Sequence, residues 1–502
     1  MERVLSLTAD DLGALAQRAR DLAPLAERIE WRLDGLFGVR HGELPTADEL
    51  AAAARGLERP WIAACHAAGD PGVVGGARLD DDVRIELLRR AAQAGASMVD
   101  VPLALAPRCP ELPGGAGRIL SVHVEDVPAD ADAALAAAAA QARGNDRIKF
   151  VAAPTDAVDM VRLLLALERH VQKSGVPATA FATGIHGLAS RILAPVFGAS
   201  FLLMAPPLGR GAPTAVGQPA LDVLDRAWPA AGVGAQTRFF GVAGSAARHS
   251  LSPAVHAAAQ RDSGLDAVYA AFETADLDAL LDLIADHPRF GGLSVTSPHK
   301  ERALARATSA DETSVAAGAA NTLVRRASGL HAFNTDVPAL QSALARARTS
   351  SRCALVLGAG GAARAALLAL SRLGWPRSVA ARRDAQAQQL ALEFGARHVP
   401  WDGIDHAPFD VLVQTTPRGS SAHPLELAYE GELPPGCLVL DAVYRPLNTP
   451  LLRKARASGC EVVSGADWFL MQAAEQVQLF HGVEANADTL ARAFFETLAA
   501  EL

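Results

Sequence analysis

Short apolar segments alternate with amphipathic stretches throughout residues 1–232. This alternation predicts repeated βα units, and therefore an α/β fold with parallel strands. Eight such units match a (β/α)₈ TIM barrel, although periodicity alone does not separate a barrel from an open doubly wound sheet. The eight segments with strand character are Val4–Leu7, Arg28–Leu33, Trp61–Cys65, Ser97–Val101, Ile119–Val124, Ile148–Ala152, Ala178–Ala182 and Phe201–Ala205.

A second βα series follows a Pro/Gly/Ala stretch at residues 229–235, which has the composition of a linker. This series begins at Arg238–Val242 and runs to residue 345. Beyond residues 346–351, the strand candidate Cys353–Leu357 opens a third series. Because 502 residues are too many for one hydrophobic core, we expect separate domains.

A glycine-rich turn joins the strand Cys353–Leu357 to a predicted helix at Arg364–Leu373 and matches the pattern G-x-G-x-x-A. Gly358 permits the tight turn, Gly360 lets the backbone approach a pyrophosphate, and the helix start offers N–H groups to phosphates. The setting between strand and helix predicts a Rossmann dinucleotide site. Its expected contact residues are Gly358, Ala359, Gly360, Gly361, Ala362 and Thr415.

The end of the next strand indicates which dinucleotide binds. An NAD site usually has a carboxylate there for the ribose 2′-hydroxyl. This chain has Arg382 and Arg383 instead, and guanidinium groups suit a 2′-phosphate. Both arginines could also be solvated surface residues, but their position favours NADP as the cofactor.

Charge and cysteine content restrict the partners of the chain. The net charge is −8 and no basic stripe is present, which argues against nucleic acid. The five cysteines are scattered, so we expect free thiols in a reducing, cytoplasmic location. No two Cys, His or Asp residues have the spacing of metal ligands, so we expect no metal site. No apolar stretch is long enough for a bilayer, and the strand at Val4–Leu7 leaves no room for a targeting peptide.

Residues 238–502 resemble shikimate dehydrogenase in several segments that occur in the family's order. They are Gly244–Pro253, Gly292–Glu301, Gly318–Thr322, Asn334–Asp336, Asp441–Tyr444 and Gln472–Ala474. The resemblance implies that Lys300 and Asp336 form the pair at the reacting carbonyl, where an ammonium stabilises the oxygen that gains charge during hydride transfer. It also implies that the substrate contacts are Ser250, Ser252, Thr296, Asn321, Tyr444 and Gln472.

Alternatives remain for this half. Lys300 and Asp336 could be a simple ion pair, although the agreement of several motifs favours catalysis. Many family members have Asn at the position of Ser294 and Gly at that of Val337, and Val337 could tighten the pocket. The presence of both Ser250 and Ser252 favours shikimate, and a quinate dehydrogenase is the alternative.

Residues 3–225 resemble type I 3-dehydroquinate dehydratase, and this resemblance favours the barrel over the open sheet. The matching segments are Glu30–Asp34, Ser121–His123, Ile148–Phe150, Gly187–Arg191 and Thr214–Pro219. Each lies at the C-terminal end of a predicted strand or in the loop after it, the face on which barrel enzymes place their active sites.

Lys149 lies within an apolar strand, so its side chain should point into the barrel. Burial lowers the pKa of an amine and favours attack on a ketone. The resemblance implies that Lys149 forms a Schiff base with 3-dehydroquinate and that His123 moves the proton. It further implies that Arg191 binds the carboxylate, with Glu30, Arg32, Thr214 and Gln218 around the hydroxyl groups. A structural lysine and a core histidine are the alternatives.

The barrel departs from its family more than the other half does. His66 replaces an arginine, Val74 a glutamate and Pro102 an acidic residue, and Thr183 and Thr214 replace Met and Ser. We expect that His66 and Val74 remove polar contacts to substrate and support for His123. The barrel is therefore interpreted as a working, weakened dehydratase, with a silent or altered-substrate barrel as the alternative.

Together these features predict a bifunctional enzyme that converts 3-dehydroquinate to 3-dehydroshikimate and then to shikimate with NADPH. The expected partners are these small molecules, and no oligomeric state is predicted. The predicted domains are a barrel at 1–232, a substrate domain at 236–345 with helices 468–502 returning to it, and a Rossmann domain at 346–467.

Overall fold

The structure is a computed structural model that describes the chain except residues 38–43, 77, 110, 346–352 and 501–502. The chain forms two compact units. One comprises Met1–Phe239 and Gly264–Arg289, and the other Phe240–Ser263 and Phe290–Leu502. The predicted boundary between the second and third domains falls at residues 346–352, outside the described residues.

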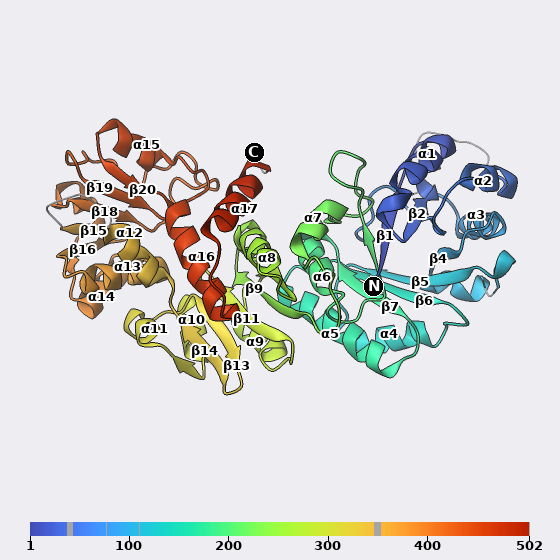
Figure 1. Cartoon of the computed structure of the whole chain (residues 1–502), viewed down its shortest axis with the longest axis horizontal. Coiled ribbons are helices and arrows are strands. Elements are labelled where there is room, and N and C mark those ends of the chain that lie inside the picture. Colours follow the sequence, from blue (N-terminus) through green and yellow to red (C-terminus); the bar gives the residue numbers. More distant parts are fainter. Residues whose placement is uncertain (38–43, 77, 110, 346–352, 501–502) are drawn as a thin grey trace. The chain divides into compact units, whose positions relative to one another are not determined.

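The N-terminal unit contains a ring of eight parallel strands in the order β7-β6-β5-β4-β3-β2-β1-β8 (Figure 1). The ends of this series meet where the Ser200 N–H donates to the Ala178 carbonyl at 2.8 Å. The predicted TIM barrel is thereby confirmed, with every strand within two residues of its expected bounds. The strands are β1 Glu2–Leu7, β2 Arg28–Arg32, β3 Trp61–Ala64, β4 Met98–Pro102, β5 Gly117–Val124, β6 Arg147–Ala152, β7 Ala178–Ala182 and β8 Phe201–Met204.

Helices surround the ring and cover the outward side chains of its strands. In β6, Ile148 and Phe150 are fully buried on either side of Lys149, and since successive strand residues face opposite sides, Lys149 points the other way. Aspartate or threonine side chains cap several helix starts, as Asp11 does for α1. The helices are α1 Leu12–Leu22, α2 Ala47–Ala54, α3 Asp81–Gln93, α4 Ala131–Ala139, α5 Ala157–Lys173, α6 Gly187–Leu193 and α7 Leu221–Ala227.

Residues Gly264–Arg289 group with the barrel rather than with the segment that surrounds them in sequence. Glu168 of α5 accepts a hydrogen bond from Nε2 of His287 at 3.0 Å and pairs with Arg289. Phe197 packs against the ring of His287 at 5.2 Å. These contacts explain the grouping, which differs from the predicted boundary at residues 232–236.

A mixed sheet with the strand order β10-β9-β11-β13-β14-β12 follows the barrel. Its strands are β9 Arg238–Gly244, β10 Ala267–Glu273, β11 Phe290–Val295, β12 Ser309–Ala310, β13 Thr322–Arg326 and β14 Gly329–Phe333. Strand β13 runs antiparallel to both of its neighbours. The accompanying helices are α8 Ser252–Asp262, α9 Leu277–Ile284, α10 Lys300–Arg306, α11 Glu312–Ala317 and α12 Asp336–Ala345.

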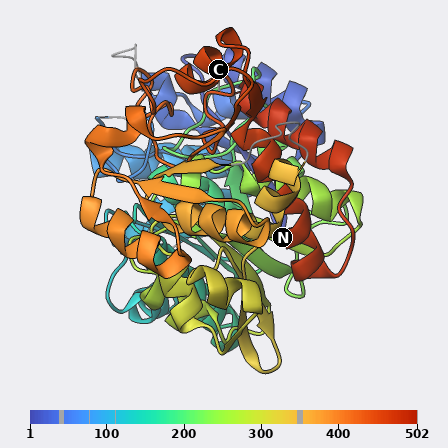
Figure 2. The same cartoon turned by 90° about the vertical axis from the view of Figure 1, so that its left-hand side faces the viewer.

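A parallel sheet in the order β17-β16-β15-β18-β19-β20 forms the predicted Rossmann fold, whose central strand β15 leads into the glycine turn. One apolar cluster lies against α13 and a second against α15, so both faces are covered (Figure 2). The elements are β15 Ala354–Leu357, α13 Gly361–Arg372, β16 Arg377–Ala380, α14 Asp384–Phe394, β17 Arg397–His398, β18 Val411–Gln414, β19 Leu438–Asp441, α15 Pro450–Ala457 and β20 Glu461–Val463.

The last two helices are α16 Gly465–His481 and α17 Ala487–Ala500. Val255 of α8 shares one apolar cluster with Val477 of α16 and Phe494 of α17. The chain therefore returns after the Rossmann sheet to pack on the first helix of the mixed-sheet segment.

Candidate active sites

The barrel encloses a small cavity of about 30 Å³. All seven residues predicted for the barrel site line it: Glu30, Arg32, His123, Lys149, Arg191, Thr214 and Gln218. They come from strands β2, β5 and β6, from helix α6 and from the loop after β8, so the tertiary fold brings together side chains that are distant in sequence.

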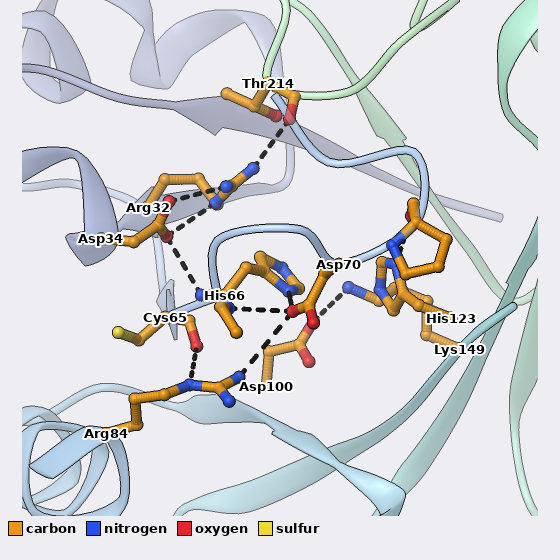
Figure 3. Close-up of polar contacts among 12 residues, drawn as sticks. Arg32, Asp34, Cys65, His66, Asp70, Arg84, Asp100, His123, Lys149 and Thr214 are labelled. Carbon is orange, nitrogen blue, oxygen red and sulfur yellow. Dashed lines mark hydrogen bonds and ion pairs between the residues drawn. The ribbon is translucent and has the colours of Figure 1, made fainter. Parts of the chain in front are cut away.

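Lys149 is buried as predicted, but it is not isolated. Its Nζ donates to Oδ2 of Asp100 in the middle of β4 (Figure 3), and the side chains are 3% and 0% exposed. Burial is the largest single influence and opposes ionisation of Asp100. The electrostatic contributions of Lys149 and His66 and the hydrogen bonds from Lys149 and Ser121 together outweigh it and lower the Asp100 pKa to about 2. We did not predict this partner, although a carboxylate inside an apolar strand was the available signal.

His123 is positioned by a backbone carbonyl. Its Nδ1 lies 3.2 Å from the oxygen of Pro71, and because a carbonyl only accepts, Nδ1 carries the hydrogen. Nε2 therefore has the free lone pair, and it is buried without a hydrogen-bond partner among the described residues. Burial first, and then the charge of Lys149, lower the pKa of His123 to about 4. The imidazole is thus a neutral base at neutral pH.

Glu30 and Thr214 belong to one polar network that also includes Ser6, which was not predicted. The Ser6 hydroxyl donates to Glu30 and lies 2.6 Å from the hydroxyl of Thr214. The Thr214 N–H in turn donates to Oε1 of Gln218 at 2.8 Å. Burial raises the pKa of Glu30. In the part of the chain that the structure describes, the second oxygen of Glu30 has no hydrogen-bond partner. A substrate hydroxyl group could occupy that position.

Arg32 and Arg191 are both buried but differ in their partners. Arg32 makes a two-pronged pair with Asp34 at 2.9 and 2.7 Å. Arg191 forms no ion pair with any described residue; it donates to the Ala182 carbonyl at 2.9 Å and stacks on Phe181. Burial lowers its pKa to about 9. A buried guanidinium without a counter-ion is suited to a substrate carboxylate.

Val74 lies outside the barrel cavity that contains His123. The side chain of Val74 is 47% exposed and does not line the cavity, while the Pro71 carbonyl holds His123. Thr183 does line the cavity, and its hydroxyl donates to the Ala152 carbonyl at 3.2 Å. The valine side chain therefore gives the imidazole no polar contact, and the Pro71 carbonyl is the group that holds it.

A second cavity, of about 200 Å³, lies in the C-terminal unit. Every predicted substrate residue of this half lines it: Ser250, Ser252, Thr296, Lys300, Asn321, Asp336, Tyr444 and Gln472. Ser294 and Gln476 also line it and were not predicted as contacts; the hydroxyl of Ser294 donates to Gln476 at 2.7 Å. Val337 is fully buried in an apolar cluster and does not line the cavity, contrary to the expectation that it narrows the pocket.

Lys300 and Asp336 are the first residues of α10 and α12, and Nζ of Lys300 donates to Oδ2 of Asp336 at 2.6 Å. Their side chains are 17% and 8% exposed. A Cβ at Gly361 would lie 2.8 Å from Cδ of Lys300. The lysine thus packs directly against the glycine turn, as required of a group beside a bound nicotinamide.

The polar side chains around this pair are held by one another. The amide of Asn321 donates to the Thr335 hydroxyl at 2.9 Å, and its oxygen accepts from the Thr335 N–H at 2.9 Å. The Ser250 hydroxyl donates to that of Ser252 at 3.0 Å. These bonds order several hydrogen-bonding groups around a cavity of the size of a small ring acid.

The glycine turn fits a dinucleotide. Gly358 has φ of +124°, and a Cβ there would lie 2.3 Å from Oγ1 of Thr415, whereas no atom lies within 4 Å of a Cβ at Gly360. Space for a pyrophosphate therefore exists beside the start of α13. Arg382 and Arg383 follow β16 and are exposed. This donor set suits NADP.

Membrane spans and metal clusters are both absent from the described part of the chain. No helix there has the length and apolarity needed to cross a membrane. No three His, Cys, Asp or Glu side chains there are grouped so that they could hold a metal ion.

Two family models match the sequence. The model for type I 3-dehydroquinase matches residues 4–233, and the model for the substrate-binding domain of shikimate dehydrogenase matches residues 242–323. The first range covers the barrel, and the second covers the mixed-sheet segment from β9 to the start of β13.

Individual relatives cover the two halves together or the second half alone. The chloroplastic bifunctional 3-dehydroquinate dehydratase/shikimate dehydrogenase of Arabidopsis thaliana is 31% identical over 434 residues, 81% of this chain and 71% of that protein. The NADP⁺ shikimate dehydrogenase of Syntrophobacter fumaroxidans is 38% identical over 251 residues, 48% of this chain and 87% of that protein. The structure of shikimate 5-dehydrogenase from Thermus thermophilus with NADP(H) and shikimate is 34% identical and covers 52% of this chain and 99% of its own, with a TM-score of 0.47. With two sites, two matching family models and a relative that spans both halves, the chain belongs to the family of bifunctional 3-dehydroquinate dehydratase/shikimate dehydrogenases.

Proposed function

We propose that the two cavities catalyse consecutive steps and that a lysine–aspartate pair is central to each. The observation that carries this proposal is the presence of Lys149 with Asp100 in one cavity and of Lys300 with Asp336 in the other. The product of the barrel, 3-dehydroshikimate, is the substrate of the second site.

In the barrel, Nζ of Lys149 attacks the C3 carbonyl of 3-dehydroquinate, and the carbonyl oxygen leaves as water to give an imine. Asp100 stabilises the positive charge of the protonated imine. Nε2 of His123 takes the proton from C2, and the electron pair expels the C1 hydroxyl, which leaves as water with the proton that His123 returns. Hydrolysis of the imine then releases 3-dehydroshikimate and restores Lys149.

Two kinds of side chain bind the substrate in the barrel: a guanidinium group without a carboxylate partner among the described residues, and a set of polar groups that line the cavity. Arg191, which has no carboxylate partner among the described residues, binds the carboxylate of the substrate. Glu30, Arg32, Thr214 and Gln218 face its hydroxyl groups.

In the second cavity, Lys300 stabilises the negative charge that develops on the carbonyl oxygen of 3-dehydroshikimate and delivers a proton to it. Asp336 holds the ammonium in place. NADPH, when bound, supplies the hydride. Gly358, Ala359, Gly360, Gly361, Ala362 and Thr415 would hold its pyrophosphate side, and Arg382 with Arg383 its 2′-phosphate.

Ser250 and Ser252 bind the carboxylate of the substrate in this site. Thr296, Asn321, Tyr444 and Gln472 bind the ring and its hydroxyl groups. The two serines support shikimate as the product. Comparison of rates with shikimate and with quinate in the presence of NADP⁺ tests this preference.

We further propose three domains, at 1–232, 236–345 with helices 468–502, and 346–467. The proposed location is the cytoplasm, which is supported by five cysteines that are all free. The partners are small molecules, without nucleic acid or membrane.

The decisive experiment follows the enone absorbance produced from 3-dehydroquinate without NADPH. Borohydride added during this reaction should reduce the imine and attach the substrate covalently to Lys149, which peptide mass spectrometry identifies. The absence of both product and adduct at saturating substrate would overturn the dehydratase proposal and leave the reductase proposal standing.

A further inference from the structure

A second imidazole lies in the barrel cavity, and the mechanism above does not use it. His66 follows β3, is buried and lines the cavity. Its ring centre lies 5.1 Å from that of His123 at an interplanar angle of 58°. The backbone N–H of His66 donates to Oδ1 of Asp34 at 3.2 Å. Asp34 is also the carboxylate that pairs with Arg32.

One edge of the His66 ring faces a carboxylate. Nδ1 lies 3.6 Å from Oδ2 of Asp70, and the same oxygen accepts from the Ala67 N–H at 2.9 Å and lies 3.9 Å from Nη2 of Arg84 (Figure 3). Asp70 is therefore held on two sides while it faces the imidazole. A distance of 3.6 Å is longer than a hydrogen bond, but such contacts often tighten when substrate binds.

The groups around His66 determine its charge. Burial first, and then the charges of Arg32 and Lys149, lower the pKa of His66 well below its usual value; Asp100 acts in the opposite direction, and His123 lowers it further. The imidazole is therefore neutral at neutral pH and has one N–H and one lone pair. The nearby carboxylate of Asp70 favours the hydrogen on Nδ1, which leaves the lone pair on Nε2.

We propose that His66 is a specificity-determining residue of the barrel site, whose Nε2 accepts a hydrogen bond from a hydroxyl group of the substrate ring, and that Asp70 is the positioning residue that fixes its tautomer. This inference rests on the proposed dehydratase function. The cavity already contains the cations of Lys149, Arg32 and Arg191, so a neutral acceptor adds recognition of a hydroxyl group without another buried charge.

The first test compares His66→Phe with His66→Gln in the full-length protein. Phenylalanine keeps the packing against His123 but offers no acceptor, so the KM for 3-dehydroquinate should rise by ~10-fold while kcat changes little. Glutamine restores an acceptor and should recover most of the affinity. A fall in kcat at unchanged KM, or equal behaviour of both variants, would overturn the proposal.

The second test uses the two carboxylates on Arg84 as a matched pair. Asp81 of α3 lies 3.2 Å from Nη1 of Arg84, whereas Asp70 lies near Nη2 and faces His66. Asp70→Asn should raise KM by ~3-fold or more and Asp81→Asn should not change it. ¹⁵N NMR of ring-labelled protein should show the Nδ1–H tautomer at His66 and its loss in Asp70→Asn. Detection of the Nε2–H tautomer in the unmutated protein would contradict the assignment.

Failure of this inference is distinguishable from failure of the dehydratase proposal. Complete borohydride labelling of Lys149 in His66→Phe at saturating substrate shows that the variant barrel is folded and reactive. Calorimetric binding of 3-dehydroquinate to Lys149→Ala and to Lys149→Ala/His66→Phe measures the contribution of His66 without turnover. Equal affinities would remove His66 from recognition even if the barrel proved inactive.

Discussion

The two active sites contain the same ion pair in different settings. Lys149 on β6 and Asp100 on β4, two strands separated by β5, meet inside a ring of strands, with side chains 3% and 0% exposed. Lys300 and Asp336 stand at the first residues of two helices beside a larger cavity, with side chains 17% and 8% exposed. In the proposed mechanism, Lys149 becomes a nucleophile that forms a covalent bond, whereas Lys300 remains a cation that stabilises an oxygen.

The comparison indicates that the chemistry of each lysine depends on the groups next to its lysine–aspartate ion pair. In the barrel, a neutral base with a free Nε2, His123, lines the same cavity as Lys149 and can move the proton that imine formation makes acidic. In the second site, the lysine packs against the glycine turn instead, where a hydride donor binds. In the proposed function, identical pairs therefore serve elimination in one site and reduction in the other.

The largest expected difference between the two sites is the loss of activity when the amine of Lys149 is removed. Lys149→Ala should lower dehydratase kcat by more than about 10⁴-fold, because no other group can form the imine. Reductase activity of the same preparation should persist and serves as the internal control for protein quality. Dehydratase turnover above a tenth of the original rate would remove Lys149 from the mechanism.

The matching change in the second site should have a smaller effect. Lys300→Ala should slow the turnover of 3-dehydroshikimate to shikimate by ~10²–10⁴-fold, the range for a positioned acid–base group. NADPH oxidation measures this rate, and the enone assay on the same variant should be unchanged. A near-normal rate of 3-dehydroshikimate reduction in Lys300→Ala would show that another group donates the proton to the carbonyl oxygen.

Stability should distinguish the two pairs. Asp100→Asn leaves a buried ammonium without its partner and should lower the free energy of unfolding of the barrel by about 3–5 kcal/mol. Asp336→Asn, at the more exposed pair, should cost less. Denaturant unfolding monitored for each unit measures both, and equal losses would contradict the difference in burial.

The Lys149–Asp100 pair predicts that the stability of the barrel depends on pH. The pKa of Asp100 is about 2 in the folded protein, below the ordinary value of ~3.9 in the unfolded chain. A lowered folded-state pKa means that the stabilisation is complete above pH ~4 and is lost as the pH falls towards about 2. Asp100→Asn should remove this part of the loss of stability at acid pH. If acid unfolding monitored across this pH range is the same in the variant, another group is responsible for it.

The smallest expected effect concerns the cofactor alone. Arg382→Ala/Arg383→Ala should weaken NADPH binding by ~10–100-fold, because two charge-assisted contacts to the 2′-phosphate disappear. NADH binding should change little, and the dehydratase rate should not change. Equal loss for both cofactors would show that the arginines do not read the 2′-phosphate.

Sequence by itself determined the strands, the glycine turn and the two lysines. Strand and turn signals are local, so the alternation around Lys149 and the motif at Gly358 predict their structures without knowledge of distant residues. The family motifs added the other predicted residues that line the two cavities.

Only the tertiary structure decided which groups meet. Asp100 is 49 residues from Lys149, and the Pro71 carbonyl is 52 residues from His123. Whether they touch depends on strand order and register and on the conformation of one loop, which are set by packing of the whole barrel. The same loop places Asp70 at His66 and turns Val74 to solvent, so residue types alone did not reveal the partners of the two imidazoles.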